Sequence, residues 1–204
     1  MSNVWFSSDF HFSHSNIAGP SVSKWKRGYR NFDSVEEMNR TIVDNINKVV
    51  GQDDILYCLG DWSFSHIYNI YAFRKQLVCN NIHLILGNHD KHIRKNNLIS
   101  KHDGSLIEPR SLFSSVQEIW EGYINKQYFY MSHYAHRVWN GSHKGSIHLY
   151  AHSHGTLPGH GKSMDVGIDT HLEFRPYSLE EIIRIMDKKE VEFSDHHTKD
   201  TNQF

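Results

Sequence analysis

Short apolar runs alternate with longer amphipathic stretches along this chain, a pattern that predicts strands connected by helices. We predict buried strands at residues 3–8, 55–59, 82–86, 147–151 and 163–168. We predict helices at residues 34–50, 65–78 and 178–186. Ser34 with Glu37, and Ser178 with Glu181, have the spacing of a capping box, which marks the first turn of two of these helices.

Segments 113–121 and 123–132 are typical of a β-hairpin that turns near Gly122.

Polar clusters follow the apolar runs. The clusters are Ser8-Asp9-Phe10-His11, Gly60-Asp61, Gly87-Asn88-His89-Asp90, Ser132-His133-Tyr134 and His152-Ser153-His154. Ligands bind beyond the carboxyl ends of strands in sheets covered by helices. The five clusters therefore predict one site at one rim of the sheet.

The composition is that of one ordinary domain. The chain has 204 residues, of which 38% are hydrophobic and 22% charged, enough to bury a core. We assign residues 1–193 to this domain and predict a disordered tail at 194–204. The net charge is -1, so no global basic field favours stable binding of nucleic acid.

Cysteine usage and hydropathy indicate the compartment. Cys58 and Cys79 stand apart and lack the CxxC spacing of a zinc or redox site, which favours buried, reduced thiols. We see no signal peptide, and no apolar run approaches the ~20 residues needed to cross a bilayer. We therefore expect a cytoplasmic protein that does not bind membranes, and the oligomeric state stays open.

Histidine is abundant, and its placement points to metal or acid–base chemistry. The 17 histidines include pairs at fixed short spacings. Residues two apart in an extended segment point the same way, so Asp9 and His11 are predicted to hold one ion together. Asp61 has two carboxylate oxygens with which to bridge two cations, and Asn88 offers a neutral oxygen. Each cluster alone is a weak signal, whereas the ordered set is strong.

Two further pairs complete the predicted site. His89 is predicted to donate a proton, with Asp90 as its orienting partner. His152 and His154 are again expected to share one face of a strand end.

The ordered motifs resemble the calcineurin-like metallophosphoesterase superfamily over roughly residues 3–186. Within it, the segments 8–17 and 32–39 are similar to small bacterial and phage phosphoesterases, which implies a bacterial cell or a phage-infected host. The resemblance implies an α/β fold, a four-layer α-β-β-α sandwich of two mixed β-sheets flanked by helices, with metals at the strand ends.

The resemblance also implies roles for individual residues. One metal ion would be held by Asp9, His11, Asp61 and His154. The other would be held by Asp61, Asn88, His133 and His152. Mixed nitrogen and oxygen ligands suit Mn²⁺ best, with Fe, Ni or Zn as alternatives. A metal-bridging hydroxide would be the nucleophile and His89 the general acid, and loss of the shared Asp61 is expected to be the most damaging change.

One departure from the superfamily favours a diester substrate. Its protein phosphatases carry a second Asp and an Arg soon after Gly-Asp, whereas this chain continues Trp62-Ser63-Phe64-Ser65. Such an Arg would clamp a monoester dianion, so its absence favours a phosphodiesterase acting on a nucleotide-type or small diester. The candidate substrate-binding residues are His14, Asn16, Trp62 and Arg137.

Several alternatives stay open. Trp62 either stacks on a base or packs inside the protein. The cations Lys24, Lys26, Arg27 and Arg30, interleaved with Trp25 and Tyr29, either grip a polyanion or form a solvated loop. The competing functions are a nuclease acting on nucleic-acid ends, a phosphomonoesterase, and a non-catalytic metal-binding module.

Overall fold

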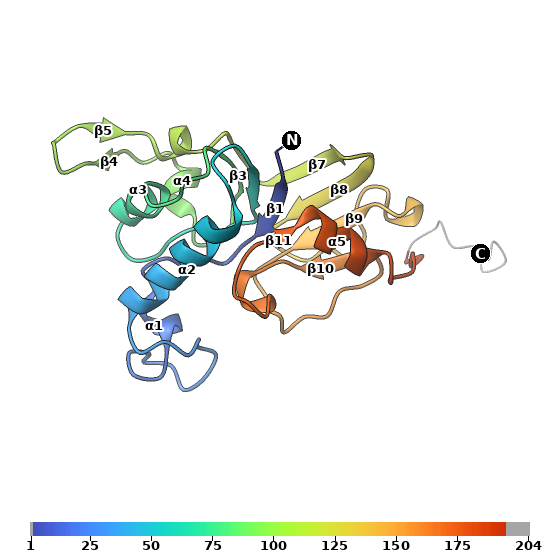
Figure 1. The fold of residues 1–204 in the computed structure, drawn as a ribbon, viewed down its shortest axis with the longest axis horizontal. Coiled ribbons are helices and arrows are strands. Elements are labelled where there is room, and N and C mark those ends of the chain that lie inside the picture. The colour runs from blue at the N-terminus through green and yellow to red at the C-terminus, as the bar shows by residue number, and fades with distance from the viewer. Residues whose placement is uncertain (1, 195–204) are drawn as a thin grey trace.

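The computed structural model describes residues 2–194, so the predicted disordered tail lies outside the described residues apart from Ser194. The first of its two main sheets is mixed, and Figure 1 shows it beside the second. Its strands, in spatial order, are β11 (Tyr177–Ser178), β1 (Val4–Ser7), β2 (Ile55–Cys58), β3 (Asn81–Ile85) and β6 (Ser115–Gln117). Strands β1, β2, β3 and β6 run parallel, and β11 is antiparallel to β1.

The second sheet is also mixed. Its strands, in spatial order, are β10 (Ser163–Asp165), β9 (Ile147–Tyr150), β8 (Gln127–Ser132) and β7 (Ile119–Ile124). Strands β10, β9 and β8 are parallel, and β7 pairs with β8 as an antiparallel hairpin. A small ribbon of β4 (Ile99–Ser100) and β5 (Leu106–Ile107) stands apart.

Five α-helices accompany the sheets within residues 2–194. They are α1 (Ser15–Ala18), α2 (Val35–Val49), α3 (Tyr68–Arg74), α4 (Lys91–Arg94) and α5 (Leu179–Met186). Short 3₁₀ helices occupy Pro109–Leu112, Ser142–Lys144 and Ile168–Thr170. No helix in the described part of the chain is long and apolar enough to cross a membrane.

Two apolar cores flank the first sheet. On its outer face, Leu56 and Leu84 pack with Met38 and Ile42 of α2 and Phe73 of α3. The inner-face core joins the two sheets and includes α5, with buried residues Phe6, Leu59, Ile85, Phe129, Met131, Leu149, Ile182 and Met186. The predicted sandwich of two mixed sheets with flanking helices is therefore confirmed.

The predicted helix caps are confirmed in part. Ser178 and Glu181 form the full reciprocal capping box. Ser34 accepts a hydrogen bond from the backbone N–H of Glu37, but the Glu37 carboxylate accepts from Asp33 N instead of Ser34 N. The predicted helix at 65–78 is shorter, since Ser65 has a φ of 68° and regular helix covers only Tyr68–Arg74.

The predicted hairpin has a different turn. Gly122 lies inside β7 and pairs with Phe129, so the prediction of a turn there is wrong. The chain reverses at Asn125 and Lys126, whose φ values of 46° and 69° match the two central positions of a type I′ turn. The segment 113–121 also divides, because β6 joins the first sheet and β7 the second.

This turn predicts a stabilising substitution. Lys126 has a side chain in the left-handed region, which costs about 1 kcal/mol that glycine does not incur. We expect Lys126→Gly to raise the free energy of unfolding by about 0.5–1 kcal/mol in urea denaturation. Lys75→Gly is the matched control, because Lys75 has a right-handed φ of -70° and its replacement should destabilise the protein. A loss of stability in Lys126→Gly would contradict the turn assignment.

Candidate metal centre

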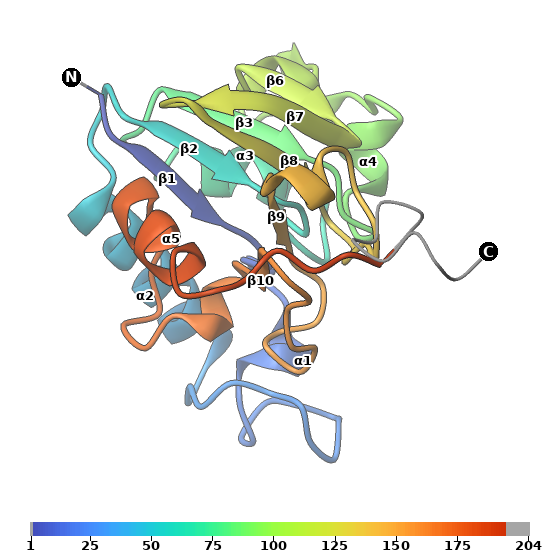
Figure 2. The same cartoon turned by 90° about the vertical axis from the view of Figure 1, so that its right-hand side faces the viewer.

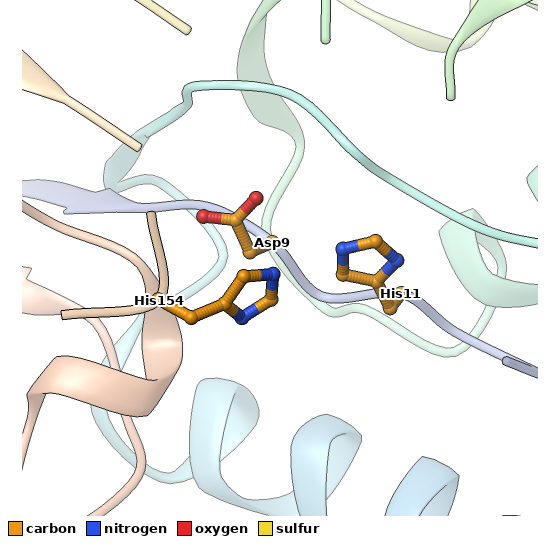
Figure 3. Close-up of side chains that lie close together, drawn as sticks. All are labelled: Asp9, His11 and His154. Atoms are coloured by element: carbon orange, nitrogen blue, oxygen red, sulfur yellow. The ribbon is translucent and has the colours of Figure 1, made fainter. Parts of the chain in front are cut away.

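The predicted ligands converge where the two sheets meet at their strand ends. Asp9, His11 and His154 form one group whose ligand atoms lie within 4.8 Å of one another. Figure 3 shows Asp9 and His11 on one stretch of chain, with the His154 ring beside them from another. The second group, with the same spacing, is formed by Asp61, His133 and His152. Each group is thus built from segments far apart in the sequence.

Asp61 lies between the two groups. Its Oδ2 atom is 3.5 Å from Nε2 of His11 and 3.6 Å from Nε2 of His133. Its other oxygen, Oδ1, accepts a hydrogen bond from the backbone N–H of His89. Asn88 belongs to the second group, because its Oδ1 is 3.0 Å from the same His133 nitrogen. One carboxylate oxygen thus faces both candidate ion positions.

The backbone at these ligands is not extended. Asp9, His11, Asp61, His152 and His154 all have φ between 47° and 68°, in the left-handed region. The predictions that Asp9 with His11, and His152 with His154, share a strand face are therefore wrong about the backbone. His152 and His154 also belong to different ligand groups. Left-handed non-glycine residues are strained and gather at functional sites, where the surrounding structure holds them.

Close packing of two glycines allows these turns. Gly60 has a φ of 104°, and a Cβ there would lie 2.5 Å from the nitrogen of Gly87. The loops after β2 and β3 therefore approach each other more closely than any side chain permits. Asp9 and His11 are tied to the same region, since their N–H groups donate to the carbonyls of Gly60 and Asp61.

Burial shifts the pKa values of these ligands and leaves some of their polar atoms without a partner. Desolvation, reinforced by Asp61 and Asp165 and opposed by His154, raises the pKa of Asp9 to about 8. Desolvation also lowers the pKa of His133 to about 4 and that of His11 well below its usual value, so both imidazoles are neutral. Asp9 Oδ1 and His11 Nε2 are buried without a hydrogen-bond partner. A divalent cation coordinated by these two atoms would supply the partner that each of them lacks, so these residues fit a metal ion.

Each buried ligand histidine is oriented through its other ring nitrogen. Nδ1 of His133 lies 2.7 Å from the carbonyl of Leu59, to which it donates. Nδ1 of His11 lies 3.1 Å from Nδ1 of His14. Both contacts leave Nε2 as the free ligand atom, which is how metal-binding histidines are usually held. His14 therefore contacts the predicted ligand His11 directly. Its side chain is 4% exposed, and its ring stacks on Phe64 with 3.6 Å between the ring centroids.

A buried ion pair orients the third ligand histidine. Nδ1 of His154 donates to Oδ2 of Asp169 at 2.7 Å. Arg30 holds both oxygens of that carboxylate, at 2.7 and 2.9 Å, and also donates to the backbone carbonyls of Asp9 and Phe10. Although burial opposes it, this arrangement lowers the pKa of Asp169 and raises that of His154. The sequence analysis missed Asp169 and assigned Arg30 to a surface cluster, because neither belongs to a motif.

Asp90 has a different role from the predicted one. Its carboxylate accepts hydrogen bonds from the backbone N–H groups of Gly87, Asp61 and Trp62, at 2.8 to 3.0 Å. Within the described residues it makes no hydrogen bond to the His89 ring, so the expected orienting hydrogen bond is absent. Burial raises its pKa to about 6. Asp90 therefore joins the loops after β2 and β3, which carry Asp61 and Asn88.

The predicted substrate-binding residues are dispersed. Trp62 is fully buried in the outer core, where its indole donates to the carbonyl of Ile70, so the prediction of a base-stacking wall is wrong for this residue. Asn16 accepts a hydrogen bond from the backbone N–H of Lys24. Arg137 is exposed on the segment between His133 and His152.

His89 stands at the open side of the centre. Its side chain is 38% exposed, and its Nε2 lies 4.0 Å from Asp61 Oδ2. The ring meets those of His11 and Phe64 edge-on, at 5.4 and 4.9 Å. It is therefore near both candidate ion positions and accessible to a ligand, which the buried histidines are not.

Two known proteins resemble this chain in sequence. It is 28% identical to the uncharacterized protein MJ1445 of Methanocaldococcus jannaschii over 94% of this chain and 95% of that protein. It is 30% identical to the gene 66 protein of Mycobacterium phage L5, over 59% of this chain and 49% of that protein. No family model matches the sequence.

Among solved structures, a protein of unknown function from Aquifex aeolicus has a TM-score of 0.61 at 18% identity, over 91% of this chain and all of that one. An archaeal phosphodiesterase and the phosphoesterase Yfce of E. coli each reach a TM-score of 0.45, with 16% and 14% identity over 81% of this chain and 82% and 78% of theirs.

The fold and the gathered motifs agree with the arrangement predicted from the sequence. Two mixed sheets meet face to face, and the motif residues meet at their strand ends. This is the arrangement expected from the resemblance: a sandwich of two mixed sheets with helices, in which the predicted ligands gather at the strand ends. In sequence the chain resembles an archaeal and a phage protein.

The raised pKa of Asp9 predicts how the metal-free protein responds to pH. Between about pH 4 and 8 the unfolded chain has Asp9 ionised, whereas the folded protein keeps it protonated. Its contribution to stability is therefore lost as the pH rises through this range, by up to about 1.4 kcal/mol per unit. In urea unfolding with chelator, Asp9→Asn should gain stability relative to wild type from about pH 5 to 8. Parallel stability curves would contradict this.

The Arg30–Asp169 pair predicts a distant effect on metal affinity. Arg30→Lys keeps the charge but loses the bidentate hydrogen bond to the Asp169 carboxylate. Asp169 is then held less firmly, and the His154 ring that it orients can rotate. We expect Mn²⁺ affinity, measured by titration calorimetry, to fall about 10- to 100-fold. Arg175→Lys is the matched control, because Arg175 also donates two hydrogen bonds to one carboxylate, that of Glu181, and neither residue belongs to a ligand group. Equal affinity in Arg30→Lys and Arg175→Lys would refute the role.

Proposed function

We propose that this protein is a hydrolase of phosphate diesters that uses two divalent metal ions. The position of Asp61 Oδ2, midway between the His11 and His133 nitrogens, is the observation that carries the proposal. One ion would be held by Asp9, His11, Asp61 and His154. The other would be held by Asp61, Asn88, His133 and His152. Two ions held by a shared carboxylate supply a nucleophile from water at neutral pH and stabilise the charge of the transition state.

The charge of the ligand set favours an anionic substrate. Only Asp9 and Asp61 bring negative charge, while the remaining ligands are neutral imidazoles and an amide. Two divalent ions therefore leave the centre with net positive charge, which attracts a phosphate ester. Mixed nitrogen and oxygen ligands favour Mn²⁺, with Fe, Ni or Zn as alternatives.

His89 is the residue suited to protonate the leaving oxygen. It is exposed enough to meet a substrate, and it lies beside Asp61 at the edge of both ligand groups. A hollow lined by Phe64, Asn88, His89 and Lys91 opens next to it and offers room for the leaving group. Protonation there converts a poor alkoxide leaving group into an alcohol.

The proposed preference for diesters rests on how the arginines near the metal centre are paired. A monoester dianion calls for a guanidinium clamp in addition to the metals. Arg30 lies near the centre, but it is buried and bound to Asp169 and to backbone carbonyls. Arg94 is paired with Glu118. These two guanidinium groups are therefore not available to meet a second negative charge. Residues 62–65, which follow Gly60-Asp61, include no Arg, and this supports a nucleotide-type or small diester.

His89→Asn tests the proposed acid. With Mn²⁺ bound, we expect kcat on bis-para-nitrophenyl phosphate to fall modestly, because nitrophenolate leaves without help. On a diester with an alkyl leaving group, kcat should fall about 10²- to 10⁴-fold. Metal content, measured by plasma mass spectrometry, should match wild type. His102→Asn is the control and should be unaffected, because the His102 ring packs on Tyr68, outside both ligand groups.

Other outcomes separate the competing functions. Equal losses on both leaving groups, or loss of the metals, would refute the acid role of His89. Faster turnover of para-nitrophenyl monoester than of diester would favour a phosphomonoesterase. No turnover of any ester with Mn²⁺, Fe²⁺, Ni²⁺ or Zn²⁺ would leave a non-catalytic metal-binding module.

A further inference from the structure

The segment between α1 and α2 combines cations with exposed aromatic rings. Figure 2 shows it projecting from the body of the molecule. Residues 19–32 contain no acidic residue but include Lys24, Lys26 and Arg27. Trp25 and Tyr29 lie among them with 46% and 38% of their surface exposed. Exposed aromatic rings interleaved with cations are the groups that contact the bases and the backbone of single-stranded nucleic acids.

The three cations are free to meet a partner. All three are exposed, and none forms an ion pair among the described residues. Arg30 at the end of the segment differs, because it is buried against Asp169 and takes no part in this surface. The segment therefore presents three uncompensated positive charges to solvent.

A continuous row of rings links this segment to the candidate acid. Trp25 meets the His14 ring edge-on at 5.4 Å. His14 stacks on Phe64 at 3.6 Å, and Phe64 meets His89 edge-on at 4.9 Å. His14 is buried within this row, so the contacts fix the position of Trp25 relative to Phe64 and His89 at the edge of the metal centre.

The cationic surface continues on the other side of His89. The hollow next to it is lined by Phe64 and also by His66, Lys91 and His92. Lys91 is exposed and forms no ion pair within residues 2–194. The one acidic side chain lining the hollow is Asp90, which is buried and bound to three backbone N–H groups. Positive charge thus flanks the candidate acid on both sides.

The projecting segment is held in place at both ends. The backbone N–H of Lys24 donates to the Asn16 side chain, and that of Ser23 to the Gly19 carbonyl. At the other end the Arg30 N–H donates to Ile17 at 2.7 Å. The aromatic and cationic groups are therefore presented on a fixed loop, which lowers the entropy lost on binding.

We propose that the substrate is a single-stranded nucleic acid, which lies across His89 from the loop of residues 19–32 to Lys91. This rests on the proposed diesterase function. Exposed rings suit unstacked bases, and cations on both sides suit successive phosphates of one chain. A duplex would hide its bases from Trp25. The net charge of -1 does not oppose this, because the charges that meet the strand are local.

Salt dependence of binding tests the strand path. The probe is fluorescein-labelled oligodeoxythymidylate of about ten nucleotides, bound to Mn²⁺-loaded protein that carries His89→Asn so that the probe stays intact. Replacing Lys24, Lys26 and Arg27 by Gln should make the negative slope of log K against log salt shallower by about 2, since each phosphate contact contributes about 0.7. The same change at Lys126, Lys144 and Lys188, which are exposed elsewhere, should leave the slope unchanged. Equal slopes in the two triple variants would overturn the proposal.

Kinetics with intact His89 separates this inference from the proposed function. Wild type should hydrolyse the oligonucleotide with a KM at least about tenfold below that for bis-para-nitrophenyl phosphate. Trp25→Ala should lower the ratio of kcat/KM for oligonucleotide to that for the small diester about tenfold, whereas Tyr123→Ala, an exposed aromatic on the β7–β8 hairpin, should not. Turnover of the small diester without any advantage for the oligonucleotide, or tighter binding of duplex than of single strand, would overturn this inference alone. No turnover of either would refute the proposed function.

Discussion

The burial of Asp9 and Asp61 beside neutral imidazoles is the constraint on which the rest of this structure depends. Two carboxylates enclosed together repel each other and lose their hydration, and desolvation raises the pKa of Asp9 to about 8. The imidazoles offer lone pairs instead of compensating charge, because the pKa of His133 is lowered to about 4. Divalent cations resolve both problems, since they neutralise the carboxylates and satisfy the orphaned ligand atoms.

The two sheets contribute to the centre in a way that couples metal binding to folding. Asp9, His11, Asp61 and Asn88 follow strands of the first sheet, whereas His133, His152 and His154 follow strands of the second. Each ligand group therefore includes residues from both sheets. Bound ions would join the two layers at their rim, and their binding free energy would offset the strain of the five left-handed ligand residues.

Local patterns predicted the parts of the structure that local physics decides. Apolar runs placed β1, β2, β3 and β9, the Ser178 cap placed α5, and the motif order identified the ligands that the fold gathers. The failures arose where distant contacts decide. Trp62 is buried by α3, the β7–β8 turn is set by two positive φ values with no glycine signal, and Arg30 meets Asp169 across 139 positions of sequence. Such pairs leave no spacing pattern for a single sequence to show.

One oxygen of Asp61 is placed so that it would face two ions at once. Electron paramagnetic resonance of the protein titrated with Mn²⁺ tests this most directly, because ions about 3.5–4 Å apart are magnetically coupled. We predict that about two Mn²⁺ bind per chain and give the multiline spectrum of a coupled pair, which Asp61→Asn abolishes. Two independent six-line signals, or saturation at one ion per chain, would contradict the claim.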